Sequence, residues 1–209
     1  MIDVRHAAAP ELAAIEIEGI SRGAFVMRSA LAVGAVYGTT MVSPFVRQAF
    51  AQSGGGDIEI LNFALTLEYL EADFYEKSMR LNLDSELMDI ATEFGSNEAE
   101  HVEALAGTIT DLGGTPVEKP TFMFPLKNQA SFLKLAQTLE DTGVGAYNGA
   151  GPMIESKEVL AAAGSIVQIE ARHAAAIRLK NGAEPAPAAF DEAIEMQAVL
   201  DAVKPFIKA

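Results

Sequence analysis

Two of the three histidines in the chain end a similar four-residue segment. Residues 98–101 read Glu-Ala-Glu-His, and residues 170–173 read Glu-Ala-Arg-His. In each segment a Glu precedes the His by three positions, which places both side chains on one face of a helix. A carboxylate oxygen and an imidazole nitrogen at this spacing can bind the same metal ion. The two segments therefore predict a metal site built from two separate helices.

A site for two metal ions needs one further Glu from each of two more helices. Glu68 and Glu140 are available, because each lies in an otherwise apolar helical stripe. Four buried carboxylates and two divalent cations are together neutral, and each His supplies one neutral nitrogen. Glu71 is an alternative to Glu68, since both can turn inward. The predicted ligands are Glu68, Glu98, His101, Glu140, Glu170 and His173.

Two tyrosines follow the additional Glu residues at the same distance. Tyr75 lies seven residues after Glu68, and Tyr147 lies seven residues after Glu140. Seven residues are nearly two helical turns, so each Tyr shares the face of its Glu. We expect the phenols to hydrogen-bond a ligand carboxylate or to exchange an electron with the site. A core aromatic with a satisfied hydroxyl is the alternative interpretation. The repeated spacings indicate two similar helical hairpins.

Caps, turns and apolar periodicity predict four long helices and a short one. Their approximate ranges are 57–81, 85–112, 129–150, 156–180 and 191–203. Residues 113–127 contain three Pro and are long enough to cross a bundle between its second and third helices. No stretch alternates at period two for long enough to predict a sheet. The predicted fold is all-α, with a four-helix bundle over residues 57–182 and a C-terminal tail helix within residues 183–209.

Local signals mark where these helices begin and where one of them is weak. Asp84 or Ser85 is the predicted N-cap of the second helix, and Ser156 is that of the fourth. The third helix has glycines throughout its second half, at positions 143, 145, 149 and 151. Glycine lowers helix propensity, so we expect tertiary packing to hold this half in a helix.

Residues 1–56 differ in composition from the rest of the chain. Arg22 and Arg28 precede a run of apolar and small residues that closes with Ala49-Phe50-Ala51, followed by a Gly-rich linker. This pattern is typical of an export signal cleaved after Ala51, which predicts a periplasmic or extracellular protein. The segment Ser21–Phe25 also resembles a weakened twin-arginine signal, with Gly23 at the second Arg position. The alternative is a retained segment that packs on the bundle, on another subunit or on a membrane.

The overall composition excludes several classes of function. The net charge is −14, and it belongs to residues 52–209 because residues 1–51 hold four Arg and four acidic residues. Such a body repels nucleic acid and anionic lipid, so neither is expected as a partner of the bundle. The chain has no Cys, which excludes disulfides, zinc–thiolate sites, cysteine-bound iron–sulfur clusters and thiol catalysis.

With these residues in place, the chain resembles the ferritin-like superfamily, which includes bacterioferritin and rubrerythrin. The segment Glu68-Tyr-Leu-Glu-Ala-Asp-Phe-Tyr75 is similar to the first ligand segment of bacterioferritin, and the other predicted ligands follow in the same order. Residues 113–117 and 187–190 add a resemblance to exported ferritin-like proteins of bacteria, some called desiccation-related. The resemblance covers about residues 57–209, and it implies a ferritin-like bundle with two iron ions; manganese and zinc are possible replacements.

Several functions are compatible with such a site. The leading hypothesis is a di-iron oxidoreductase that oxidises Fe(II) or reduces oxygen or peroxide. A self-contained rubrerythrin-type peroxidase is disfavoured, because the chain lacks the cysteines of a rubredoxin-like domain. The alternatives are a structural or stress-protection scaffold, which can assemble into a homo-oligomer, and a metal buffer without turnover.

Overall fold

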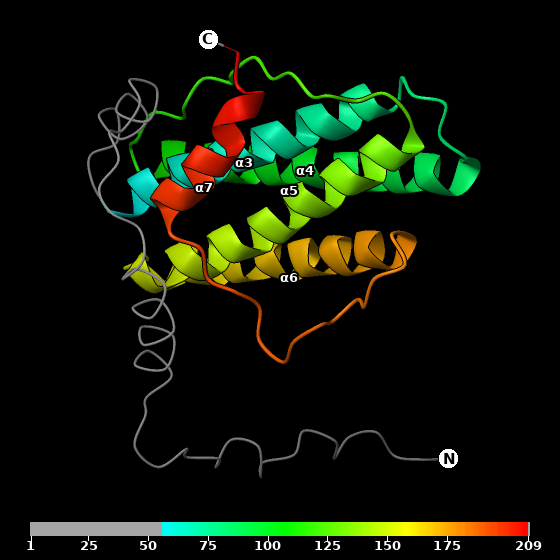
Figure 1. Ribbon diagram of the computed structural model, residues 1–209. Helices are drawn as coiled ribbons and strands as arrows, with labels where there is room; N and C mark the ends of the chain where they lie inside the picture. Colours follow the sequence, from blue (N-terminus) through cyan, green and yellow to red (C-terminus); the bar gives the residue numbers. More distant parts are fainter. Residues whose placement is uncertain (1–55, 209) are drawn as a thin grey trace, which may run out of the picture.

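The computed structural model describes residues 56–208, which form an all-α bundle (Figure 1). The four long helices are α3 (Asp57–Ser78), α4 (Ser85–Asp111), α5 (Gln129–Ala150) and α6 (Lys157–Lys180). Shorter elements follow α5 and α6: η3 (Gly151–Met153), α7 (Met196–Val203) and η4 (Lys204–Phe206). An isolated bridge between Phe122 and Ile207 is the only β pairing among the described residues. The predicted all-α fold is confirmed.

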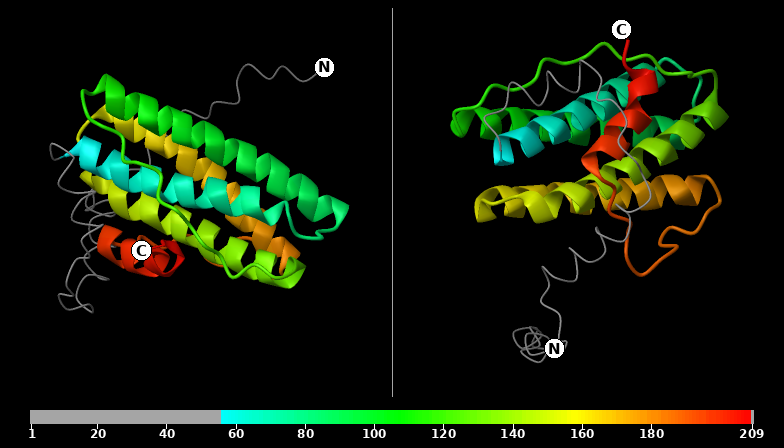
Figure 2. Two further views of the ribbon diagram at one scale, coloured as in Figure 1. Left: turned by 90° about the horizontal axis from the view of Figure 1, so that it is seen from above. Right: turned by 60° about the vertical axis from the view of Figure 1, so that its left-hand side comes forward.

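The four long helices form two antiparallel hairpins. Short connections join α3 to α4 and α5 to α6, and each of these pairs is in extensive contact. The connection between α4 and α5 runs the length of the bundle, so these two helices point in the same direction (Figures 1 and 2). This arrangement is the crossover that the Pro-rich segment predicted, and it brings both hairpins around one interior.

Capping residues fix the start of the two helices that carry the Glu-x-x-His segments. The Asp84 carboxylate accepts the backbone N–H of Leu87 at 2.9 Å, and the Ser156 hydroxyl accepts that of Val159 at 3.2 Å. Each bond satisfies one of the free donors in the first turn of its helix. At the other end of α4, Gly113 adopts a positive φ of 80° and ends the helix.

The core consists of apolar side chains above and below a polar layer. Along α4, the polar residues lie between buried Phe94 and Leu105, and along α6 they lie between buried Ile166 and Ile177. Aromatic packing is dense on one side of this layer, where the rings of Phe74 and Phe132 stack with centroids 5.6 Å apart. The polar layer is thus shielded along the bundle axis in both directions.

A buried asparagine attaches the crossover to the bundle. The Asn62 side chain is fully buried on α3; its amide donates to the carbonyl of Thr115 at 3.2 Å, and its oxygen accepts the N–H of Val117 at 2.8 Å. Two backbone polar groups of an extended segment are thereby satisfied where that segment passes over apolar surface. The crossover in turn binds the end of the chain, because Met123 donates to Phe206 and Lys208 donates to Thr121.

Two glycines of α5 allow the segment before the tail helix to pack closely on α5, and this packing determines where the tail helix begins. A Cβ added at Gly149 would lie 1.9 Å from the carbonyl oxygen of Ile194, and one at Gly145 would lie 2.5 Å from the Ile194 side chain. The N–H of Ile194 donates to the carbonyl of Gly145 at 2.9 Å. Because this segment lies extended against α5, the tail helix begins at Met196 rather than near Asp191 as the sequence predicted.

The export-signal pattern, its cleavage point after Ala51 and the weakened twin-arginine segment lie outside the described residues. Within residues 56–208, no helix is both long enough and apolar enough to span a membrane.

We predict that Asn62→Ala destabilises the protein. The substitution leaves the Val117 N–H and the Thr115 carbonyl without their partner, which costs about 1–3 kcal/mol of the free energy of unfolding. Urea denaturation followed by circular dichroism measures this difference. Asn82→Ala is the matched control, because Asn82 is exposed in the loop after α3. Equal stability of the two variants would show that Asn62 does not hold the crossover.

Candidate metal centre

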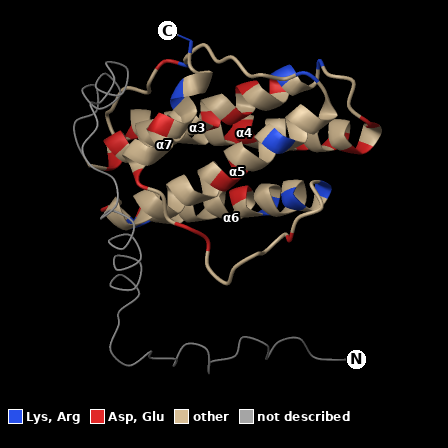
Figure 3. Ribbon diagram, viewed as in Figure 1, with Lys and Arg blue, Asp and Glu red and all other residues tan. Residues whose placement is uncertain are grey.

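Acidic residues occur on each of the four long helices (Figure 3), and a group of them is buried in the bundle interior. Glu68, Glu98, Glu140 and Glu170 have no exposed surface, and one comes from each helix. His173 is 2% exposed. His101 has a side chain that is 12% exposed, so its end of the site lies nearer to solvent. The structure therefore brings all six predicted ligand side chains together.

The side chains divide into two sets of four that share two members. One set is Glu68, Glu98, His101 and Glu170, and the other is Glu98, Glu140, Glu170 and His173. Within each set, one ligand atom from every residue lies within 4.8 Å of the others. Each set therefore surrounds a position suited to a metal ion. Glu98 and Glu170 belong to both sets, so the two positions share these carboxylates.

The His101 nitrogen points at the centre of its set rather than at one partner. Its Nδ1 lies 2.9 Å from Glu98 Oε2, 3.1 Å from Glu68 Oε2 and 3.1 Å from Glu170 Oε1. A single N–H cannot be aligned with three acceptors. Convergence of one nitrogen and three oxygens is instead the arrangement of ligands around a shared cation.

His173 is positioned by two residues of α4 that the sequence did not single out. The Phe94 ring stacks on the imidazole with centroids 3.8 Å apart, and the Asn97 amide contacts Nε2 at 3.1 Å. Nδ1 faces the carboxylates, 2.9 Å from Glu98 Oε1 and 3.6 Å from Glu140 Oε2. The Asn97 atom that faces Nε2 is the amide nitrogen, which donates; the ring proton then lies on Nδ1, toward the carboxylates, and a metal ion bound at Nδ1 would displace it.

Whether the six predicted ligand side chains fit a metal ion can be judged from the hydrogen bonds that their oxygen and nitrogen atoms make. Six buried side-chain polar atoms of the described residues make no well-aligned hydrogen bond, although histidine nitrogens lie close to several of them. All except Asp141 Oδ1 belong to predicted ligands: Glu98 Oε1, Glu140 Oε2, both carboxylate oxygens of Glu170, and His173 Nδ1. Buried polar atoms are normally satisfied, so unsatisfied oxygens and a nitrogen gathered at one place fit cations.

The sequence of residues 56–182 matches the family described as the ferritin-like domain. This range contains the four helices and all six converging side chains.

The chain belongs to the ferritin-like domain family.

Two solved structures share this ferritin-like fold. One is a conserved hypothetical protein, rv2844, from Mycobacterium tuberculosis, with 18% identity and a TM-score of 0.55 over 69% of this chain and 99% of that one. The other is a ferritin like, diiron-carboxylate protein from Bacillus anthracis, with 21% identity and a TM-score of 0.55 over 66% of this chain and 99% of that one. No curated protein matches the sequence.

The two tyrosines connect the hairpins of the ferritin-like bundle. Tyr75 on α3 donates to Glu140 Oε1 on α5, and Tyr147 on α5 donates to Glu68 Oε1 on α3. Each phenol thus holds the carboxylate of the other hairpin rather than the one on its own helix. Burial, reinforced by the partner carboxylate, raises the pKa of both phenols well above the ordinary value. Both therefore remain neutral hydrogen-bond donors.

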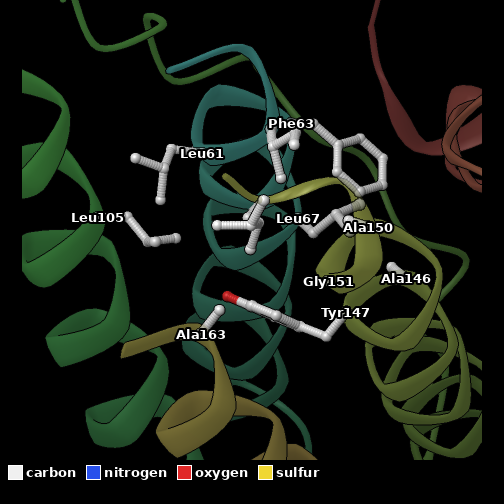
Figure 4. A pocket seen from close by; sticks show the side chains of 12 residues that line it. Leu61, Phe63, Leu67, Leu105, Ala146, Tyr147, Ala150, Gly151 and Ala163 are labelled. Carbon is white, nitrogen blue, oxygen red and sulfur yellow. The ribbon is translucent and has the colours of Figure 1, made fainter. Parts of the chain in front are cut away.

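An apolar pocket adjoins the site on the Tyr147 side. Figure 4 shows the Tyr147 ring among aliphatic side chains that include Leu67, Leu105 and Ala163. Since the Tyr147 hydroxyl also holds Glu68, this residue lies between the pocket and the carboxylates. The pocket therefore gives the site an apolar boundary that excludes water.

The ligands repeat at a constant separation that sequence inspection could have used. Glu68 and Glu140 are 72 residues apart, the difference between their numbers. The same separation relates the three other pairs: Glu98 and Glu170, His101 and His173, Tyr75 and Tyr147. Each hairpin therefore contributes an equivalent half of the site. The repeat breaks at Glu71, whose counterpart is Gly143.

Glu71 was the open alternative to Glu68, and the structure buries both. Glu68 is a member of one four-residue set, whereas Glu71 is 2% exposed and belongs to neither set. Burial, and then the charge of Glu170, raises the pKa of Glu71 well above its ordinary value. The geometry therefore favours Glu68 as the ligand and leaves Glu71 as an additional carboxylate beside the site.

The remaining groups have strongly altered pKa values. Burial opposes the charged form of His101, but its hydrogen bonds to carboxylates, Glu170 first, raise its pKa to about 12. Burial likewise opposes the charge of His173, and Glu140 and Glu98 raise its pKa to about 10. Burial raises the pKa of Glu68 to about 7. It also acts to raise that of Glu98, but hydrogen bonds to both histidines lower it to about 2.

We predict that the stability of the metal-free protein falls as pH rises. The pKa of Glu68 rises from 4.5 to about 7, and that of His173 rises from 6.5 to about 10. Between pH 4.5 and about 7 the folded chain keeps a proton on Glu68 that the unfolded chain has lost, and between pH 6.5 and about 10 it keeps one on His173. The free energy of unfolding therefore decreases as the pH rises. The lowered pKa of Glu98 has the opposite effect, but only below pH 4.5. Metal ions displace these protons, so their stabilising effect increases with pH.

Thermal unfolding of the metal-free and Zn(II)-loaded protein, measured from about pH 5 to about pH 9, tests this linkage. The rise in Tm caused by Zn(II) should grow across the range. A rise that is constant or shrinks with pH would contradict proton displacement at the six side chains.

Proposed function

We propose that this ferritin-like chain is a di-iron carboxylate protein that oxidises Fe(II) and reduces oxygen or peroxide. The observation that carries the proposal is the pair of four-residue sets that share Glu98 and Glu170. A site for one ion needs no shared carboxylates and only one His. The Bacillus anthracis protein with the same fold is described as a diiron-carboxylate protein, which agrees with this assignment.

The donor chemistry supports iron. Each set offers three carboxylates and one imidazole, and such oxygen-rich ligation with one nitrogen suits Fe and Mn and tolerates Zn. Thiolate ligands, which select softer metals, are absent from the sequence. The four carboxylates of the two sets carry a charge that two divalent ions neutralise, so filling the site removes an unfavourable buried charge.

The residues of the proposed site have different roles in binding two ions. Glu98 and Glu170, which both sets share, would hold both ions, and Glu68 with His101 and Glu140 with His173 would each hold one of them. Tyr75 and Tyr147 orient the end carboxylates by hydrogen bonds. These donors hold the site in shape before an ion arrives, which limits the reorganisation on binding.

Redox chemistry requires that the substrate reach the ions while bulk water stays away. Two Fe(II) ions held here supply two electrons, the number that reduces one peroxide molecule, with two protons, to two water molecules. The apolar side chains around the layer limit access by water, and His101 is the most exposed of the ligands. The sequence has no Cys, so no cysteine-bound iron centre within it supplies electrons to the site.

We further propose that the bundle works outside the cytoplasm, as the export-signal pattern and the resemblance to exported ferritin-like proteins imply. Intact-mass measurement on protein purified from its native host tests this. The expected mass corresponds to a chain that begins at Gln52, after cleavage behind Ala51. A mass that includes residues 1–51 would contradict cleavage.

We predict that wild-type protein binds two Fe(II) ions per chain under anaerobic conditions. Addition of oxygen or peroxide should then oxidise both ions, seen as new near-ultraviolet absorption. Glu98→Gln removes a carboxylate shared by both sets, so it should lower the affinity for both Fe(II) ions roughly 10- to 100-fold. Glu68→Gln should lower the affinity for only one of them.

Glu100→Gln is the matched control, since Glu100 lies on the same helix but is exposed. It should leave iron binding unchanged, and circular dichroism of the metal-free variants establishes that each is folded. Binding without oxidation would favour a metal buffer or scaffold. Binding that is insensitive to Glu98→Gln would refute the assignment of the site.

A further inference from the structure

The two tyrosines of the site have different surroundings. Three aromatic rings surround Tyr75, with centroids 5.0, 5.8 and 6.2 Å from its own ring: Phe74, Phe94 and Phe132. The residues that the 72-residue repeat relates to these three are smaller and aliphatic: Ala146, Ile166 and Ile60. Ala146 and Ile60 line the apolar pocket together with Tyr147. The pocket therefore occupies the place beside Tyr147 that aromatic rings fill beside Tyr75.

The pocket adjoins one of the two proposed metal positions. Leu67 and Leu105 line it; Leu67 directly precedes Glu68, and Leu105 follows His101 by one helical turn. Glu68 and His101 belong to the same four-residue set. Tyr147 lines the pocket as well, and its hydroxyl donates to Glu68 (Figure 4). A molecule in the pocket therefore lies next to the Glu68 and His101 end of the site.

The size and the polarity of the pocket restrict what it can bind. Its cavity volume is about 20 Å³, and the surface that lines it is entirely apolar. About 10–15 Å³ of such volume holds one water molecule, but a buried water also needs polar partners. The Tyr147 hydroxyl does not provide one, because it is bound to Glu68. The pocket therefore suits one small molecule that makes no hydrogen bonds.

Resting on the proposed function, we propose that this pocket binds dioxygen and supplies it to the site, and that peroxide does not use it. Dioxygen is diatomic and apolar, so it enters a preformed dry pocket without losing hydrogen bonds. Hydrogen peroxide donates and accepts hydrogen bonds, and binding here would leave them unmade. Gly151 and Ile154 are the half-buried residues of the lining, so they mark the end at which dioxygen enters.

Dissolved oxygen is itself the probe, because it is paramagnetic and accelerates the relaxation of nearby methyl protons. The full chain, metal-free and methyl-labelled, is compared by NMR under nitrogen and under oxygen. The gain in relaxation rate should be larger at Leu67 and Leu105 than at their counterparts in the repeat, Leu139 and Ile177. These counterparts are also buried, but they lie in the aromatic part of the core. An equal gain at the two pairs would overturn the inference.

Variants that fill the pocket provide the second test. Ala163→Val adds two carbon atoms to the lining, and Ala146→Phe introduces the ring that Phe74 has in the other hairpin. Each should abolish the excess relaxation at the two leucines, and circular dichroism establishes which of them is folded. Ala162→Val makes the same change at an exposed neighbouring position on α6, so the excess should remain. An excess that survives in a folded, filled variant would contradict binding in the pocket.

Kinetics of the iron-loaded protein separate this inference from the proposed function. Ala163→Val should slow the oxidation of Fe(II) by oxygen and leave its oxidation by peroxide unchanged, whereas Ala162→Val should change neither. Equal slowing of both reactions, or no slowing of the reaction with oxygen, would overturn the inference. A wild type that oxidises Fe(II) with neither oxidant would overturn the proposed function, and the relaxation measurement would still decide whether the pocket binds dioxygen.

Discussion

The structure depends on four carboxylates that are buried side by side in an apolar bundle. Ionised carboxylates in such a place repel one another and lack water, and each costs several kcal/mol unless a cation or a proton compensates it. In the metal-free chain the compensation comes from protons: both histidines have raised pKa values, and so does Glu68. Under the proposed function, bound metal ions replace these protons, and the carboxylate oxygens of the layer that make no hydrogen bond fit them.

The rest of the bundle supports this layer. Two hairpins each contribute half of the ligands, and the crossover lets them face each other across one interior. Tyr75 and Tyr147 hold the carboxylates from opposite sides. Apolar clusters above and below exclude water, which strengthens every charge interaction inside.

Much of this was predictable from the sequence because the signals are local. Glu-x-x-His fixes two ligands on one helix face, Asp84 and Ser156 mark helix starts, and Pro-rich residues 113–127 exclude a helix. The family match and the fold agree with the predicted ferritin-like bundle. Contacts between distant segments were not predictable. Periodicity places Tyr75 on the face of Glu68, but only the packing of two hairpins shows that it bonds Glu140.

The tail shows the same limit. Residues 191–195 have helical propensity, but Gly145 and Gly149 leave space along α5, where the extended backbone at Ile194 hydrogen-bonds the helix.

The central claim is that six side chains hold two metal ions. Anomalous diffraction from iron-loaded crystals tests it most directly. Two peaks should lie about 3.5–4 Å apart between Glu98 and Glu170. A single peak, or peaks only on the acidic surface, would contradict the account.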